Sequence, residues 1–256
     1  TRSNSSSDII GSCILGITCC SSTGLYLNGG KAGNDLLTPF LNDYTEHFQY
    51  CTYDVTSLLA QDNTLSVLLG DGWYRGHFGL GEPTHYERPL ALIAELCMEF
   101  ADGHTETLRS DSGWQYRSSF TTLSDIYNGE TQDYTKASGD WKQPVLIPAP
   151  GRLCDRYSSP LHYMESIPVK EVIHTPAGET VLDFGQNFAG HVVCTQPIPN
   201  GTAMTLEFGE VLQNGNFYHE NYRHAESKFT YVSDGISREI RPRFTFFGFR
   251  YVKVSG

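Results

Sequence analysis

The chain has 256 residues, of which 39% are hydrophobic and 12% are aromatic, and its formal net charge is −11. This length allows one large domain or two domains of roughly 100–150 residues each. The negative charge excludes the basic surface with which nucleic-acid-binding proteins neutralise phosphates, and it disfavours binding to anionic membranes. We therefore expect neither nucleic acid nor a membrane as a partner. A neutral ligand such as a carbohydrate suits an acidic chain rich in aromatic residues.

In chain order, the first half is a series of short strands separated by turns. Alternating or apolar runs predict strands at residues 25–27, 50–55, 65–69, 90–100 and 114–117. Asn28, Gly29 and Gly30 predict a hairpin turn after the first of these strands. The helix signal is poor and is limited to one turn at residues 55–59, capped by Asp54.

The most informative motif has the sequence GDGWYRG and occupies residues 70–76, at the end of the predicted strand 65–69. A Gly–Asp–Gly turn there presents Trp73, Tyr74 and Arg75 together. Aromatic rings stack on the apolar face of a pyranose, and a guanidinium donates hydrogen bonds to its hydroxyl groups. Asp71, Trp73, Tyr74 and Arg75 are therefore the carbohydrate-binding candidates. The alternative is that Trp73 fills the core of a β-sandwich.

The second half begins after a proline-rich stretch between residues 143 and 168, which predicts a boundary between domains 1–155 and 156–256. Further strands are predicted at residues 170–174, 180–184, 191–195, 204–208, 229–232 and 244–254. Strands spaced about 8–12 residues apart with turn residues between them indicate a sandwich. The predicted fold is thus all-β, with two antiparallel β-sandwich domains of the jelly-roll or concanavalin-like kind. Gly248 is expected to mark a bulge or a close backbone approach that swaps the facing of the last strand.

The seven cysteines are odd in number and irregular in spacing, and they form no zinc-ligand pattern. We expect mostly free thiols, which favours a cytoplasmic over a secreted location. The N-terminus has no basic segment followed by an uninterrupted apolar one, so no signal peptide is predicted. The apolar stretches are far shorter than the about 20 residues of a membrane-spanning helix.

A calcium ion is the one cofactor that the residues suggest. Asn34 and Asp35 offer adjacent oxygen-bearing side chains in a loop after Gly33. Two ligands are too few to define a site, and the alternative is a turn with Asn34 in a left-handed conformation.

Catalysis by a glycosidase mechanism needs two carboxyl groups about 5–9.5 Å apart, one of them with a raised pKa. The candidate groups are Asp71 with Glu87, and Asp183 with Glu207 and Glu210. Asp71 has the alternative of capping backbone amides in its turn, and Glu207 that of lying on a solvated strand face. No catalytic residue is assigned from the sequence.

Eight motifs in this order resemble the N-terminal β-domain of bacterial-type α-L-rhamnosidases and the β-sandwich that follows it. In the first half they are YLNG at 26–29, GNDLLTP at 33–39, QYCTYDVT at 49–56 and GDGWYRG at 70–76. In the second half they are VLDFGQN at 181–187, EVL at 210–212, NYRHA at 221–225 and PRFTFFGFRYV at 242–252.

The resemblance implies a role without catalysis of its own. In that family, carboxylates on an (α/α)6 barrel that follows these sandwiches carry out the hydrolysis. The chain is then expected to be a fragment that is inactive alone, has the barrel as its partner in cis, and supports recognition of rhamnose-containing glycans or glycosides. Related rhamnose-binding modules hold calcium partly through an Asp–Asn pair, whereas the order here is Asn34–Asp35. A structural scaffold for the barrel and a stand-alone carbohydrate-binding module remain the alternatives.

Overall fold

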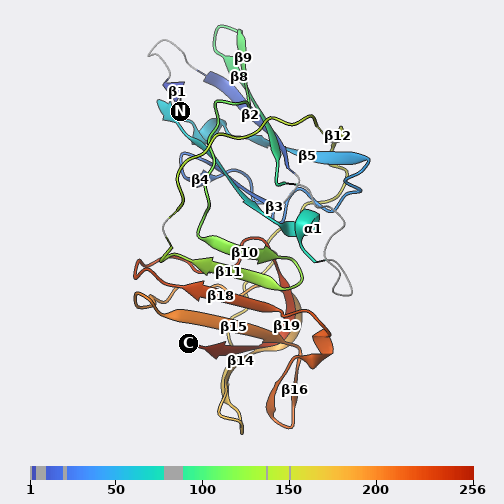
Figure 1. The fold of residues 1–256 in the computed structure, drawn as a ribbon, viewed down its shortest axis with the longest axis vertical. Helices are drawn as coiled ribbons and strands as arrows, with labels where there is room; N and C mark the ends of the chain where they lie inside the picture. Colours follow the sequence, from blue (N-terminus) through green and yellow to red (C-terminus); the bar gives the residue numbers. More distant parts are fainter. Residues whose placement is uncertain (1, 4–9, 20–21, 78–88, 137, 150) are drawn as a thin grey trace. The chain divides into compact units, whose positions relative to one another are not determined.

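The computed structural model describes residues 2–3, 10–19, 22–77, 89–136, 138–149 and 151–256. The described chain is nearly all β-structure, as predicted, and it divides into two compact units (Figure 1). The first unit contains residues 1–70, 86–117 and 140–162, and the second contains residues 71–85, 118–139 and 163–256. Two segments that precede residue 155, residues 71–85 and 118–139, belong to the second unit.

The first unit is a sandwich of two sheets. Its five-stranded sheet has the order β12-β5-β2-β8-β9, with bounds Arg152–Asp155, His47–Asp54, Ile10–Cys19, Leu92–Phe100 and Thr105–Arg109. Its three-stranded sheet has the order β4-β3-β7, with bounds Gly30–Lys31, Ser22–Leu27 and Leu65–Gly70. Alternate residues of β2, β3 and β8 form the core between the sheets. A two-stranded sheet joins β1 (Arg2–Ser3) to β6 (Asp62–Asn63). Among the described strand pairs of this unit, β5 and β12 are parallel and the others are antiparallel.

Two local predictions in the first unit are confirmed. Asn28 and Gly29 form the turn between β3 and β4, which pair in antiparallel register. The predicted helical turn is a 3-10 helix, η1 (Thr56–Leu58). Asp54 precedes it, and its Oδ1 accepts hydrogen bonds from the backbone N–H and the hydroxyl group of Thr56.

The second unit is built on one seven-stranded sheet with the order β10-β11-β18-β15-β19-β14-β13. The bounds are Thr121–Asp125, Gly129–Asp133, Lys228–Val232, Ala203–Gly209, Phe247–Ser255, Thr180–Gly190 and Glu171–His174. The pair β11–β18 is parallel, and it draws residues 118–139 into this sheet (Figure 1). Aromatic residues of β14, β15, β18 and β19 form the core. The remaining described elements are the hairpin β16 (Val211–Gln213) and β17 (Asn216–Tyr218), and the short helices α1 (Gly72–Arg75) and η2 (Glu220–Tyr222).

The expected change of facing at Gly248 is wrong. Phe247 and Phe249, on either side of it, are both buried, so the alternation of β19 continues through the glycine. The irregularity lies instead in the neighbouring strand β14, where the register with β19 shifts between Asp183 and Phe188.

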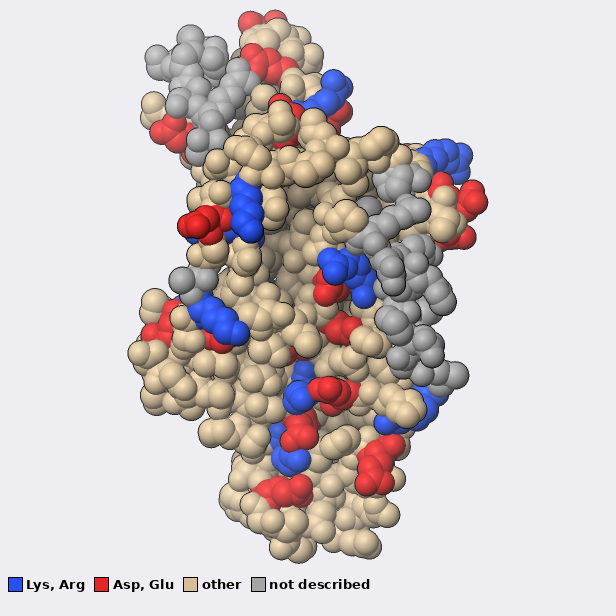
Figure 2. All heavy atoms as spheres, in the orientation of Figure 1, with Lys and Arg blue, Asp and Glu red and all other residues tan. Residues whose placement is uncertain are grey.

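Charged side chains of both signs are interspersed on the face shown in Figure 2, and no one sign gathers on the described part of that face. Ion pairs within the second unit include Lys253 with Glu207 at 2.6 Å and Arg238 with Asp234 at 2.7 Å. Of the helices in the described ranges, none has the length and apolar character needed to cross a membrane. Cysteines 13, 51, 97, 154 and 194 are free thiols.

Candidate functional site

The GDGWYRG motif forms the short helix α1 (Gly72–Arg75) in the second unit. Gly72 has φ +49°, a left-handed conformation that favours glycine. A Cβ on Gly76 would lie 2.6 Å from the carbonyl oxygen of Gly72. The two glycines are thus needed to make and end this turn, which contacts β10.

The aromatic residues of the motif separate into one core residue and one partly open residue. Tyr74 is 1% exposed, so its ring has no face on which a sugar can stack. We therefore correct the prediction for Tyr74, which is a packing residue. Trp73 is only partly buried, and its ring centroid lies 6.5 Å from that of Phe246, which is 38% exposed. The two rings form a tilted aromatic pair in the second unit.

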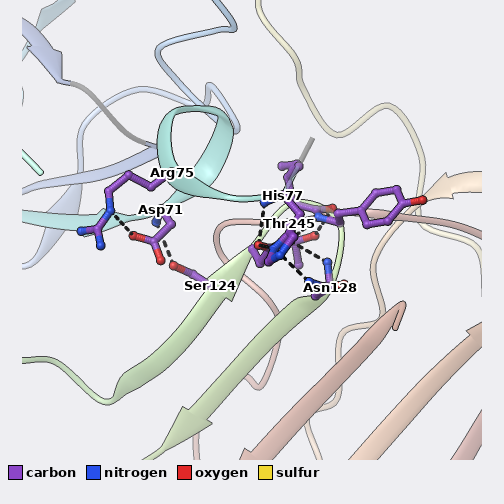
Figure 3. A network of polar contacts seen from close by, with 9 residues as sticks. Asp71, Arg75, His77, Ser124, Asn128 and Thr245 are labelled. Atoms are coloured by element: carbon purple, nitrogen blue, oxygen red, sulfur yellow. Dashed lines mark hydrogen bonds and ion pairs between the residues drawn. The ribbon is translucent and has the colours of Figure 1, made fainter. Parts of the chain in front are cut away.

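Polar groups of the same turn lie near Trp73 in sequence. Nε of Arg75 lies 3.7 Å from Oδ1 of Asp71, and both side chains are about two-fifths exposed, at 43% and 37%. The backbone N–H of Asp71 donates to Oγ of Ser124 at 2.9 Å, which ties α1 to β10 (Figure 3). Burial raises the pKa of Asp71, the charge of Asp125 adds to this effect, and Arg75 opposes it. The Asp71–Arg75 ion pair can bind the hydroxyl groups of a ligand, because the guanidinium is a donor and the carboxylate is an acceptor.

The sequence did not indicate that His77 and Asp125 lie in contact. Oδ2 of Asp125 accepts hydrogen bonds from the backbone N–H of His77 at 2.8 Å and from its Nδ1 at 2.8 Å (Figure 3). Oδ1 accepts from the backbone N–H groups of Tyr127 and Asn128, at 2.8 and 2.7 Å. The sequence DIYNG at 125–129 is a turn signal, but it does not reveal a partner 48 residues earlier. We call Asp71, Trp73, Arg75, His77, Asp125 and Phe246 the α1 cluster.

The calcium candidates lie in the first unit, where Asp35 has a cationic partner. Its carboxylate forms an ion pair with Arg156, and Oδ2 accepts a hydrogen bond from the hydroxyl group of Tyr53 at 3.3 Å. Nε2 of His162 lies 3.8 Å from Oδ1 of Asp35. The neighbouring residue Asn34 is exposed. In the described ranges no group of three or more His, Cys, Asp or Glu side chains could hold a metal. A guanidinium in contact with this carboxylate does not fit a calcium ion, so the structure does not support the calcium prediction.

The other candidate carboxylates are also engaged. Asp183 receives two hydrogen bonds from Arg250, each at 2.8 Å, and these hold the pKa of Asp183 below its usual value. Glu207 pairs with Lys253. Glu210 accepts hydrogen bonds from the side-chain amides of Asn187 and Asn221, each at 3.0 Å. Glu87 lies outside the described residues, so its proposed pairing with Asp71 has no structural account.

Residues 10–165 match the family model of the alpha-L-rhamnosidase N-terminal domain, and residues 173–256 match that of the bacterial alpha-L-rhamnosidase concanavalin-like domain. Among curated relatives, an alpha-L-rhamnosidase of Streptomyces avermitilis is 36% identical over 251 residues, covering 91% of this chain and 24% of the relative. One of Alteromonas sp. is 34% identical over 249 residues, covering 91% of this chain and 27% of the relative.

Solved structures agree with these matches. The alpha-L-rhamnosidase of Streptomyces avermitilis complexed with L-rhamnose has a TM-score of 0.91 at 32% identity, covering 97% of this chain and 26% of that one. The native enzyme from Aspergillus terreus has a TM-score of 0.91 at 30% identity, covering 100% of this chain and 31% of that one. The chain thus spans about a quarter of the length of the curated relatives that it matches. On these matches, the chain belongs to the bacterial α-L-rhamnosidase family.

Proposed function

We propose that this chain is a non-catalytic β-module of an α-L-rhamnosidase and that it supports recognition of rhamnose-containing glycans through the α1 cluster. The observation that carries the proposal is the partly exposed Trp73, paired with Phe246, on the turn that also holds the Asp71–Arg75 ion pair. Hydrolysis is assigned to carboxylates of a helical barrel in the same polypeptide. The solved relative that binds L-rhamnose supports the choice of sugar.

The chemistry of rhamnose suits this cluster. Rhamnose is a neutral 6-deoxy sugar, so it has an apolar methyl group and C–H face beside its hydroxyl groups. Aromatic contacts favour the apolar part, while Asp71 and Arg75 supply an acceptor and donors for the hydroxyl groups. A monosaccharide that uses one aromatic contact and a few exposed hydrogen bonds is expected to bind with a Kd on the order of millimolar.

Isothermal titration of the whole chain with L-rhamnose tests this proposal. Trp73→Ala and Arg75→Ala should each weaken binding. Trp141→Ala is the matched control, because Trp141 is an exposed tryptophan of the first unit that lies under the guanidinium of Arg117. L-mannose has a hydroxyl group in place of one hydrogen of the rhamnose methyl group, and it should bind more weakly. Binding that Trp73→Ala leaves unchanged, or no binding at all, would overturn the proposal.

A structural scaffold is the second candidate function, and one observation favours it. Val145, Leu146 and Ile147 are consecutive exposed apolar residues of the first unit. Such a run suits docking onto another surface, here the helical barrel. Replacing Leu146 by Ser should then reduce self-association of the isolated chain in light scattering, whereas a scaffold role fails if the wild-type chain is a clean monomer.

A further inference from the structure

His77 forms more hydrogen bonds with Asp125 than are needed to hold the turn. Asp125 is nearly buried, and its two oxygens accept four hydrogen bonds, two of them from His77. The backbone N–H of His77 already fixes the end of α1 to this carboxylate. The second nitrogen of the imidazole, Nε2, has no partner among the residues that the structure describes, and the side chain is 37% exposed.

The contact with Asp125 indicates which nitrogen of His77 carries the proton. A carboxylate oxygen 2.8 Å from Nδ1 is an acceptor, so Nδ1 must be the donor. In a neutral imidazole the other nitrogen then has a free lone pair and accepts a hydrogen bond. Nδ2 of Asn128 also lies 3.1 Å from this Nδ1, and an amide nitrogen is a donor, so this contact opposes the assignment; the shorter contact with the carboxylate favours Nδ1–H (Figure 3).

We propose that His77 is a further ligand-contacting residue of the α1 cluster, where Nε2 accepts a hydrogen bond from a saccharide hydroxyl group. Asp125 is then a positioning residue that fixes the tautomer and the direction of the ring. This inference rests on the proposed function, and it deepens it by adding a neutral acceptor to the charged acceptor Asp71. The placement supports it, because His77 follows directly on the turn that presents Trp73 and Arg75.

Substitution of His77 by asparagine distinguishes a residue that contacts the ligand from one that only holds the turn in place. In His77→Asn the side-chain amide places an N–H donor close to the position of Nδ1, so the bond to Asp125 is kept and Nε2 is lost. We expect this variant to bind L-rhamnose about 3- to 10-fold more weakly, the range for one lost hydrogen bond, with an unchanged Tm. His47→Asn in the first unit is the control, because the ring of His47 bonds only the exposed Tyr157 among the described side chains.

The outcomes distinguish this inference from the proposed function. If His77→Asn binds like the wild type while Trp73→Ala loses affinity, His77 only holds the turn in place. The inference is then overturned, while the proposed function stands. If the wild type does not bind L-rhamnose, both are overturned. Nitrogen-15 NMR of the imidazole gives an answer that needs no ligand. The Nδ1–H tautomer is expected for His77, and the Nε2–H tautomer would contradict the inference.

Discussion

Glu130 provides a sharp test of how the second unit holds the aromatic pair of the α1 cluster. The side chain is 1% exposed, and its Oε2 accepts hydrogen bonds from the backbone N–H groups of Arg243 and Phe244, both at 2.8 Å. Oε1 accepts a third hydrogen bond from Nε2 of Gln132 at 2.6 Å. The carboxylate thus fixes to β11 the segment that leads to Phe246. Burial raises the pKa of Glu130, while these hydrogen bonds oppose the rise.

Glu130→Gln keeps the shape of this side chain but removes one of its acceptor oxygens. The new NH2 group must face either the two backbone N–H groups or the amide of Gln132, so at least one buried donor meets another donor. An unsatisfied buried donor costs about 1–3 kcal/mol, and each bond that loses its charge weakens by roughly 1 kcal/mol. Relief from burying a charge acts in the opposite direction. We expect the free energy of unfolding to fall by about 2–4 kcal/mol.

The assay combines urea unfolding with amide hydrogen exchange. Glu130→Gln should lower the urea midpoint and selectively reduce the protection of the amides of Arg243 and Phe244. Glu171→Gln, at an exposed position in β13, is the control and should stay within about 0.5 kcal/mol of the wild type. Unchanged protection of these two amides in Glu130→Gln would refute the argument that the carboxylate holds this segment.

Three further predictions concern pH, backbone geometry and metal. Burial and a nearby arginine lower the pKa of His191 from 6.5 to about 4. Because the folded chain disfavours the charged imidazole, the free energy of unfolding should not change through His191 above pH 6.5. It should fall by up to about 3 kcal/mol as the pH drops to about 4. Urea titrations should show a smaller fall in His191→Gln. Gly76→Ala should cost about 1–3 kcal/mol by urea unfolding, because its Cβ would meet a backbone oxygen at 2.6 Å, whereas Gly16→Ala, with its nearest such atom at 3.9 Å, should cost less. Asp35→Asn should lower the Tm because Arg156 loses its partner, and added calcium should leave the wild-type Tm unchanged.

Each of these predictions has a clear contrary result. An equal fall in stability with pH in wild type and His191→Gln would show that another group causes it. Equal costs for Gly76→Ala and Gly16→Ala would show that the close approach within α1 is not limiting. A rise of several degrees in Tm on adding calcium, lost in Asp35→Asn, would restore the calcium hypothesis.

Local patterns predicted much of this fold because period-two alternation and turn residues act over short distances. The hairpin turn at Asn28 and Gly29 and the helical turn after Asp54 are examples. The assignment of residues 118–139 to the second sheet depends on the parallel pairing of β11 with β18. A parallel pair between segments about a hundred residues apart has no hairpin and leaves no local signal, so the sequence pattern did not indicate this pairing.

The candidate site was predictable only in part, for similar reasons. The motif GDGWYRG identified the turn, but adjacent aromatic residues with the same local pattern do not show which one is buried. The structure buries Tyr74 and leaves Trp73 partly open beside Phe246. The contact between His77 and Asp125 joins two elements that meet only in the folded unit.

The most direct test of a rhamnose contact at the α1 cluster is the indole N–H spectrum during titration with L-rhamnose. The chain has three tryptophans, so nitrogen-15 labelling gives three indole signals, each assignable by a single Trp→Phe variant. Trp73 belongs to the second unit, and Trp114 and Trp141 belong to the first. We expect a saturable shift of the Trp73 signal, with the signals of Trp114 and Trp141 unchanged. A Trp73 signal that stays fixed at saturating sugar, or a shift confined to Trp114 and Trp141, would contradict it.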